Sequence, residues 1–314
     1  MLRSLAVALA VALGMIAAGA LAPKWLLFLT TLAASRGLAV LGIFVLMRGG
    51  GASFGQGMFY AIGAYVAALS PQAFGLHDAA LRALLGMLAA GLVAAVFAPL
   101  LARYRGIFFA MLTLALSMVL FGLLSKTSAL GGSDGITIAK PTLLGAALAP
   151  QHSDWLLFSM TVVLGVAAAW AVSVYNASQA GLLAQAVRGN SLRVEYLGAS
   201  ARASLATSFI LCGLLGGLGG AITALVLGHV EPNFADWTTS GEFVFVAVLA
   251  GHHSVAAVFV ASLVLEVVRS FSNLYFPNTW QLALGTFLLL VILFRPDGIG
   301  SLWAGRKRVP RGDA

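Results

Sequence analysis

The chain has 314 residues, of which 61% are hydrophobic and only 9% are charged, and its mean hydropathy is +0.99. A soluble domain of this length could not bury so much apolar surface, so the composition excludes a soluble globular protein. The formal net charge of +8 could suggest an anionic partner such as a nucleic acid, but its distribution along the chain indicates membrane orientation first.

Apolar runs of about 18 or more residues recur along the sequence, and each is long enough to cross a hydrocarbon core of about 30 Å. They predict an all-α polytopic membrane protein with about ten transmembrane helices in one domain over residues 1–314. The expected spans are 4–22, 25–47, 54–70, 80–101, 106–125, 155–174, 203–228, 241–253, 254–273 and 279–294.

The first span follows a basic residue, Arg3, and leads to a possible small-residue cleavage site at Ala18-Gly19-Ala20. These features are typical of a secretory signal peptide. We expect a retained first helix, and cleavage is the alternative. The topology of the later spans is the same in both cases.

The second span carries Arg36 halfway along its length. A charge at that depth costs about 3 kcal/mol or more unless it faces a wet cavity or an acidic partner. One interpretation is that Arg36 binds a carboxylate-bearing substrate. The other is that it forms an ion pair with Glu242 or Glu266, and the sequence leaves both open.

The third and eighth spans are short and interrupted. Glycines crowd the start of segment 49–70, and segment 241–259 contains Gly251-His252-His253-Ser254. Interruptions at matching places fit two five-helix halves of opposite orientation, and such broken helices indicate a translocation pathway. Glycines that merely allow close helix packing are the alternative. The candidate pathway residues are Arg36, Ser53, Gln56, Tyr65, Thr113 and Ser117.

The basic residues are unequally distributed over the loops. If the N-terminus is cytoplasmic, twelve basic residues lie on the inner side and four on the outer side, as the positive-inside rule requires. Both termini, segment 175–202 and the basic tail 295–314 are then cytoplasmic, and the Gly-, Ser- and Pro-rich loop 126–154 is extracytoplasmic. This loop is either a docking surface for a soluble partner or a plain connector, and the tail anchors the topology.

Segment 181–200, "GLLAQAVRGNSLRVEYLGAS", is polar although its neighbours are almost wholly apolar. An apolar stripe predicts a short amphipathic helix along the membrane face, with a turn at Gly189-Asn190. On physical grounds alone this helix is an interfacial anchor. The stripe comprises Leu182, Leu183, Ala186, Val187, Val194 and Leu197.

The glycine-rich run 212–221 contains small-xxx-small pairs, Gly213 with Gly217 and Gly216 with Gly220. They predict close helix packing, since no Lys-Ser/Thr follows that would hold a nucleotide. Cys212 is expected to be a small packing residue. His252 and His253 could form a pH-sensitive gate or contact a motor protein, or be simply solvated; their spacing predicts no metal site.

Several motifs resemble the permease subunits of branched-chain amino acid ABC transporters. The family's cytoplasmic loop matches at Gly181, Ala186, Arg188, Asn190, Glu195 and Gly198, with Gly189 replacing its usual acidic residue. "GASFGQGMFYAIGAY" is similar through Ser53, Gly55, Gly63, Ala64 and Tyr65, with Gln56 where His is common. "RYRGIFFAMLTLALSMVL", "GGSDGI" and "LFRPDGIGSL" resemble the M-type subunit of high-affinity leucine/isoleucine/valine importers, which is related to urea and amide importer permeases.

The resemblance extends over nearly the whole chain after residue 25. It implies a permease subunit, and no enzyme, that imports branched-chain amino acids or related small polar or carboxylate solutes across a bacterial inner membrane. It further implies that the loop is a coupling helix seated on a cytoplasmic ATPase. The implied partners are a sister permease in a heterodimer, with a homodimer as alternative, two ATP-binding cassette subunits and an extracytoplasmic solute-binding protein.

No cofactor is expected on this chain, because it lacks a Gly-x-x-x-x-Gly-Lys-Ser/Thr loop and ATP would bind to the partner. An autonomous secondary transporter or channel is the alternative function. An intramembrane enzyme is less favoured, since no catalytic constellation occurs within a span.

Overall fold

The computed structural model describes residues 2–138, 141–143, 146–147, 153–251, 254–275, 279–294, 298 and 300. Helices make up most of it. They are α1 Leu2–Leu21, α2 Lys24–Arg48, α3 Gln56–Phe74, α4 Ala79–Leu101, α5 Ile107–Lys126, α6 Ser153–Ala177, α7 Gln179–Gly189, α8 Ser191–Tyr196, α9 Ala201–Leu227, α10 Trp237–Ala250, α11 Val255–Tyr275 and α12 Trp280–Phe294.

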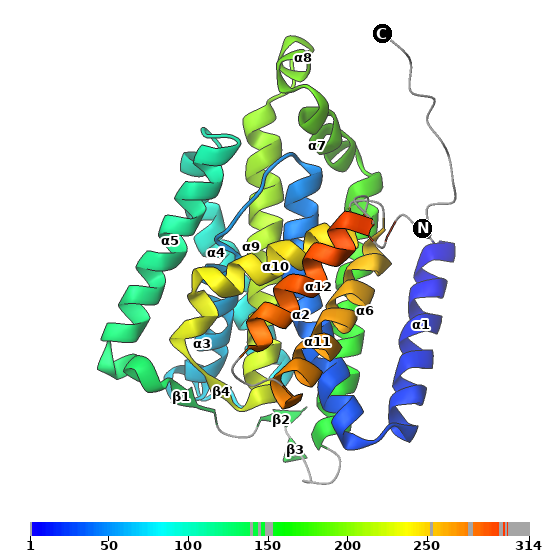
Figure 1. Ribbon diagram of the computed structural model, residues 1–314, viewed down its shortest axis with the longest axis vertical. Coiled ribbons are helices and arrows are strands. Elements are labelled where there is room, and N and C mark those ends of the chain that lie inside the picture. Colours follow the sequence, from blue (N-terminus) through cyan, green and yellow to red (C-terminus); the bar gives the residue numbers. More distant parts are fainter. Residues whose placement is uncertain are drawn as a thin grey trace.

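Four two-residue strands and three short 3-10 helices occur in the described connections. Strand β1, Ile136–Thr137, pairs antiparallel with β4, His229–Val230, and β2, Thr142–Leu143, pairs antiparallel with β3, Ala146–Ala147. The 3-10 helices are η1 Ser128–Leu130, η2 Gly132–Asp134 and η3 Pro232–Ala235. The strands lie at one end of the helix bundle, and α7 and α8 lie at the opposite end (Figure 1).

Six helices of the described residues are long and apolar enough to cross a membrane: α2, α4, α5, α6, α9 and α11. Two shorter apolar helices lie at Ser4–Ala20 and Trp237–Ala250. A multi-pass, all-α membrane protein is therefore confirmed. Every expected span overlaps a helix, but the count of ten crossings and the inverted halves stay predictions.

Polar residues at the loop ends fix where several helices begin. The side chain of Asp78 accepts hydrogen bonds from the amides of Ala80 and Leu81 at the start of α4. Ser200 accepts one from Ala203 at the start of α9, and Asp236 caps α10. Each cap satisfies an amide that has no partner within its own helix.

The core lies where α9 packs against α2, α3 and α4. The prediction that glycines 213–220 serve packing is confirmed. A Cβ on Gly220 would clash with the carbonyl oxygen of Tyr60, and one on Gly217 would lie 2.7 Å from the carbonyl oxygen of Gly86. Cys212 is fully buried in the same helix. Small residues thus let the helix backbones touch, as is typical of membrane helices.

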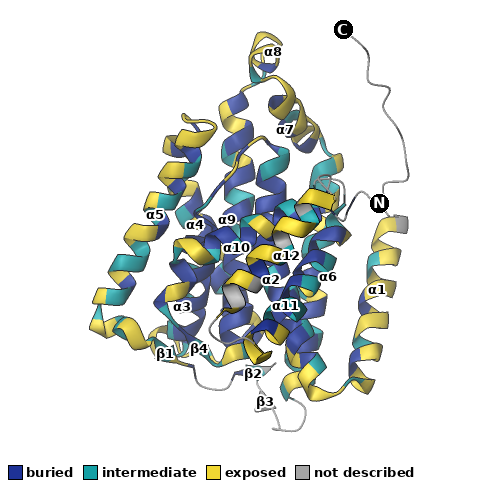
Figure 2. Ribbon diagram, in the orientation of Figure 1, coloured by how far each residue is buried: buried dark blue, intermediate teal, exposed yellow. Residues whose placement is uncertain are grey.

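The outer helices carry exposed apolar side chains. Figure 2 shows buried residues concentrated in the centre of the bundle and exposed residues along α1 and α5. Leu92 on α4 and Val119 on α5 are each 68% exposed. Such surfaces suit lipid hydrocarbon, which requires no polar partner.

Candidate functional site

Helices α7 and α8 form a bent segment at one end of the bundle (Figure 1). Helix α7 begins after Ser178, whose hydroxyl accepts a hydrogen bond from the amide of Gly181. The break falls at Asn190, whose Oδ1 accepts a hydrogen bond of 3.0 Å from the amide of Arg193 and so starts α8. The turn predicted at Gly189-Asn190 is confirmed.

The apolar stripe predicted for this segment is wrong in part. Val187 and Val194 are buried and pack with Ala201. Leu182 and Leu197, expected in the same stripe, are 57% and 81% exposed, and Ala186 is also exposed. The division falls within α7 itself, because Val187 faces Ala201 at the start of α9 while Leu182 and Ala186 lie on the exposed side of the same helix.

Exposed apolar side chains gather on this segment. Leu192 is 65% exposed and Tyr196 is 90% exposed, in addition to Leu182 and Leu197. We call these four residues the apolar tip. An exposed cluster that contains an aromatic side chain is typical of a surface that a partner protein covers.

The six candidate coupling residues occupy different environments. Gly181 is buried at the start of α7, where a Cβ would clash with the carbonyl oxygen of Tyr175. Ala186, Arg188, Asn190, Glu195 and Gly198 are exposed, and Gly198 has a positive φ of 86°. Glu195 also forms an ion pair of 3.2 Å with Arg105, which joins α8 to the loop between α4 and α5.

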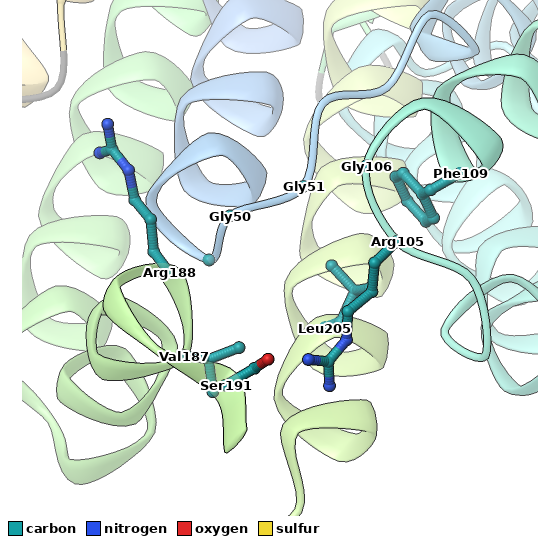
Figure 3. Close-up of a pocket in the computed structure, with 10 residues that line it drawn as sticks. Gly50, Gly51, Arg105, Gly106, Phe109, Val187, Arg188, Ser191 and Leu205 are labelled. Carbon is teal, nitrogen blue, oxygen red and sulfur yellow. The ribbon is translucent and has the colours of Figure 1, made fainter. Parts of the chain in front are cut away.

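A small pocket of about 90 Å³ lies beneath α7. Its walls come from the loop after α2, the start of α5, and α7 to α9. Figure 3 shows the backbone of Gly50 and Gly51 between Arg188 and Arg105. A Cβ on Gly50 would lie 3.2 Å from the Cα of Arg188, so the loop contacts α7 directly. The lining residues are Gly49, Gly50, Gly51, Arg105, Gly106, Phe109, Val187, Arg188, Ser191 and Leu205.

The same loop continues into the candidate pathway residues. The Ser53 hydroxyl accepts a hydrogen bond from the amide of Gly55, and Thr113 Oγ1 accepts one from the amide of Phe54. The Ser117 hydroxyl donates to the carbonyl oxygen of Ala235 at 2.7 Å. Ser53, Thr113 and Ser117 are fully buried, so the structure brings them together as internal contacts of α5 with loop 49–55 and with η3.

Gln56 and Tyr65 lie on α3. The Gln56 amide nitrogen donates to the carbonyl oxygen of Ala39 at 2.7 Å, and its amide oxygen accepts from Cys212 Sγ at 2.9 Å. Among the described residues, the buried hydroxyl of Tyr65 has no hydrogen-bond partner. In this conformation Gln56 is fully buried and connects α3 to α2 and α9.

Arg36 forms an ion pair with Glu266, with 2.9 Å between Nη1 and Oε2. This is one of the two acidic partners that the sequence suggested. A second ion pair, of 3.1 Å, joins Arg269 to Glu242. The four charged side chains lie on α2, α10 and α11. These side chains are between 9% and 23% exposed, so each ion pair remains partly accessible to solvent.

A larger pocket, of about 440 Å³, lies between the first half of α2, the start of α6, and α11. We call it the α2–α11 pocket. It combines charged residues with an apolar wall. Its lining residues are Lys24, Trp25, Phe28, Leu29, Leu32, Asp154, Glu266 and Ser270.

Comparison with known proteins places this geometry in context. Residues 25–293 match the family described as the permease component of branched-chain amino acid transport systems. The chain belongs to this family.

Two relatives of this permease family carry the name high-affinity branched-chain amino acid transport system permease protein LivM. The Escherichia coli K12 protein is 29% identical over 267 residues, which cover 78% of this chain and 62% of the relative. The Salmonella typhimurium LT2 protein is 28% identical over 282 residues, which cover 83% of this chain and 66% of the relative. The chain thus spans slightly less than two thirds of the length of each relative. No solved structure matches the chain.

Sequence reasoning missed parts of the site in this permease. The Arg269–Glu242 pair was not expected, although Arg269 follows Glu266 by three residues and so lies near it on one helix surface. No local pattern predicts the α2–α11 pocket, because three helices far apart in sequence form it. The candidate gate residues His252 and His253 lie outside the described residues.

Proposed function

We propose that this chain is the membrane-spanning permease subunit of a binding-protein-dependent ABC importer for branched-chain amino acids or related small carboxylate solutes. Family membership over residues 25–293 supports this function, as do the names of the two relatives. The complex comprises a sister permease, two ATP-binding cassette subunits and an extracytoplasmic solute-binding protein. It resides in the bacterial inner membrane, with both termini of this chain in the cytoplasm.

The apolar tip is the observation that carries the assignment. Tyr196 and Leu197 are 90% and 81% exposed at the end of the bundle that carries α7 and α8. A groove of the ATPase covers these side chains, and the exposed residues Arg188, Asn190 and Glu195 of the same segment also contact the ATPase. ATP-driven movement of the partner then displaces α7 and α8, which contact the loop at Gly50.

The substrate pathway includes Arg36 on α2, and Ser53, Gln56, Tyr65, Thr113 and Ser117 around the start of α3. The buried positions of the last five support a role that requires opening of the bundle, because they form internal contacts in this conformation. We further propose that His252 and His253, which lie outside the described residues, act as a gate. This chain binds no cofactor, since ATP is bound by the partner ATPase.

The assignment is tested with a Tyr196→Ala, Leu197→Ala double variant, co-expressed with its partner subunits. Because buried tyrosines are among the residues that dominate protein interfaces, we expect loss of ATPase co-purification and at least about a tenfold fall in ATP-driven uptake in proteoliposomes. Phe74→Ala is the matched control, since Phe74 is 68% exposed at the end of α3 and away from the tip.

Normal co-purification and uptake by the double variant would contradict this function. The competing function is an autonomous secondary transporter or channel. It would be supported if the purified chain alone moved solute down an ion gradient without ATP.

A further inference from the structure

The α2–α11 pocket has a buried carboxylate and two further charged residues in its lining. Glu266 is only 9% exposed, yet it lines the pocket. Lys24 and Asp154 belong to the first turns of α2 and α6, which begin at the end of the bundle that carries the strands (Figure 1). Ser270 lies one helical turn from Glu266 on the same side of α11. A pocket with charges of both signs suits a polar solute.

The apolar wall of this pocket comes from one side of α2. Leu29 and Leu32 are buried, and Phe28 is about half exposed. The volume of about 440 Å³ falls within the range of roughly 300–1,000 Å³ that is usual for small-molecule sites. This wall fits a branched aliphatic group, while the charged groups require a solute that also carries charge.

Arg36 is not among the residues that line the pocket, but it forms an ion pair with Glu266, which does line it, and this ion pair restricts which charge the solute carries. A simple anion that binds Arg36 would leave Glu266 unpaired, and a simple cation that binds Glu266 would leave Arg36 unpaired. An unpaired charge at this depth is unfavourable. A zwitterion avoids both costs, because its carboxylate can bind Arg36 while its ammonium group binds Glu266.

We propose that the α2–α11 pocket is a binding site for a zwitterionic aliphatic amino acid, which replaces the internal Arg36–Glu266 ion pair by two ion pairs of its own. The site rests on the proposed function and specifies its substrate class within this chain. It selects the zwitterion by charge balance and the aliphatic side chain by contact with α2.

The site is tested by thiol protection in the assembled complex in nanodiscs, without the solute-binding protein. Ser270→Cys places a thiol in the pocket, and the native Cys212 is fully buried. We measure its reaction with a water-soluble methanethiosulfonate reagent. The probes are leucine, 3-methylbutylamine, which lacks the carboxylate, and 4-methylpentanoate, which lacks the ammonium group. Leucine at ten times its dissociation constant is expected to slow the reaction about tenfold, by mass action, and the other two are expected to have no effect.

Two charge variants distinguish binding from a structural role. Arg36→Gln frees Glu266, so 3-methylbutylamine becomes protective and leucine loses its advantage. Glu266→Gln frees Arg36, so 4-methylpentanoate becomes protective. A Glu242→Gln, Arg269→Gln double variant is the matched control, because it removes the other ion pair as a whole and leaves leucine as the protective probe. Arg36→Lys keeps the charge and preserves leucine protection, should Arg36→Gln fail to fold.

Several outcomes would overturn the site. Failure of leucine to protect, or equal protection by all three probes, would show that the pocket does not select a zwitterion. If the thiol at position 270 is protected only in nanodiscs of phosphatidylethanolamine, whether or not leucine is present, the pocket binds lipid instead. If ATP-driven uptake of leucine by the complex remains intact in these cases, the proposed function stands and only the site fails.

Discussion

At the scale of single residues, the absence of a side chain decides how α9 packs. Gly220 lies against the backbone of Tyr60 on α3, and Gly217 lies against Gly86 on α4. Gly122 on α5 differs from them, since a Cβ there would meet nothing within 4 Å. The sequence contains both kinds of glycine, and only the surroundings in the fold distinguish them.

This difference predicts the effect of one methyl group. Gly220→Ala should destabilise the assembled complex by about 1–3 kcal/mol, because the new Cβ overlaps a backbone oxygen that cannot easily move. Gly122→Ala should be neutral or stabilising, by up to about 1 kcal/mol, because alanine favours the helix. The thermal midpoint of the purified complex measures both. Equal midpoints for the two variants would refute the packing argument.

Charged residues within spans could be predicted from the sequence only in part. Because a charge in hydrocarbon is costly, the sequence indicated that Arg36 needs a partner, and Glu242 and Glu266 were the possible acidic ones. The choice of Glu266 depends on how α2 and α11 pack, which no local pattern specifies. Ser53, Gln56, Thr113 and Ser117 were expected to line a pathway, but hydrogen bonds within the chain occupy them in this conformation.

At the scale of elements, the loop between α2 and α3 connects the polar segment to the interrupted helices. Gly50 contacts Arg188 on α7, and Gly51 approaches Leu205 on α9. Further along, the amide of Gly57 donates a hydrogen bond of 2.9 Å to Ser240 on α10. A displacement of α7 therefore acts on the start of α3, and from there on α10.

We expect α7 and this loop to move as one body. In a Gly50→Cys, Arg188→Cys variant, the new Cβ would lie 3.4 Å from the Cβ at 188, close to the range of about 3.5–4.5 Å that a disulfide requires. Oxidation should form the bond and leave ATP-driven uptake at the level of the reduced double variant. Uptake that is lost on oxidation and restored by a reducing agent would contradict rigid coupling.

The positive φ of Gly50 requires a control for strain. Gly228→Cys supplies it, because Gly228 has a φ of 67° and open space around its Cα. If backbone strain at the substituted glycine is what lowers uptake, the Gly228→Cys variant and the Gly50→Cys, Arg188→Cys double variant both lose uptake in their reduced forms. If only the double variant loses uptake, and only after oxidation, the loss is caused by the disulfide.

Short elements were harder to predict than long ones. Hydropathy located the long helices within a few residues, because each long span must hide its backbone in apolar surroundings. The helix after the first glycine run continues through Pro71 to Phe74, beyond its expected end at residue 70. In the polar segment, the turn was predictable from Asn190, while the orientation of each half depended on contacts with α9.

At the scale of the whole molecule, two chemically different ends are joined by an apolar bundle. One end carries α7, α8 and exposed arginines, and the other carries the strands and the starts of α2 and α6 (Figure 1). The charge asymmetry of the loops predicts that the first end is cytoplasmic.

Cysteine labelling in intact cells tests this orientation. Ser133→Cys, in the exposed η2 region, should react with a membrane-impermeant thiol reagent added outside. Arg193→Cys, exposed on α8, should react only after the membrane is permeabilised. Background from Cys212 is low because that residue is fully buried. Labelling of Arg193→Cys from outside would place the polar segment away from any cytosolic ATPase.

The glycine contacts of α9 also limit which movements this helix bundle can make. Helices whose backbones touch cannot come closer together. Sliding them past one another would force carbonyl oxygens into the backbone of the neighbouring helix. Helices α2, α3, α4 and α9 therefore form a fixed hub. We expect access to either side of the membrane to change through the helices around it.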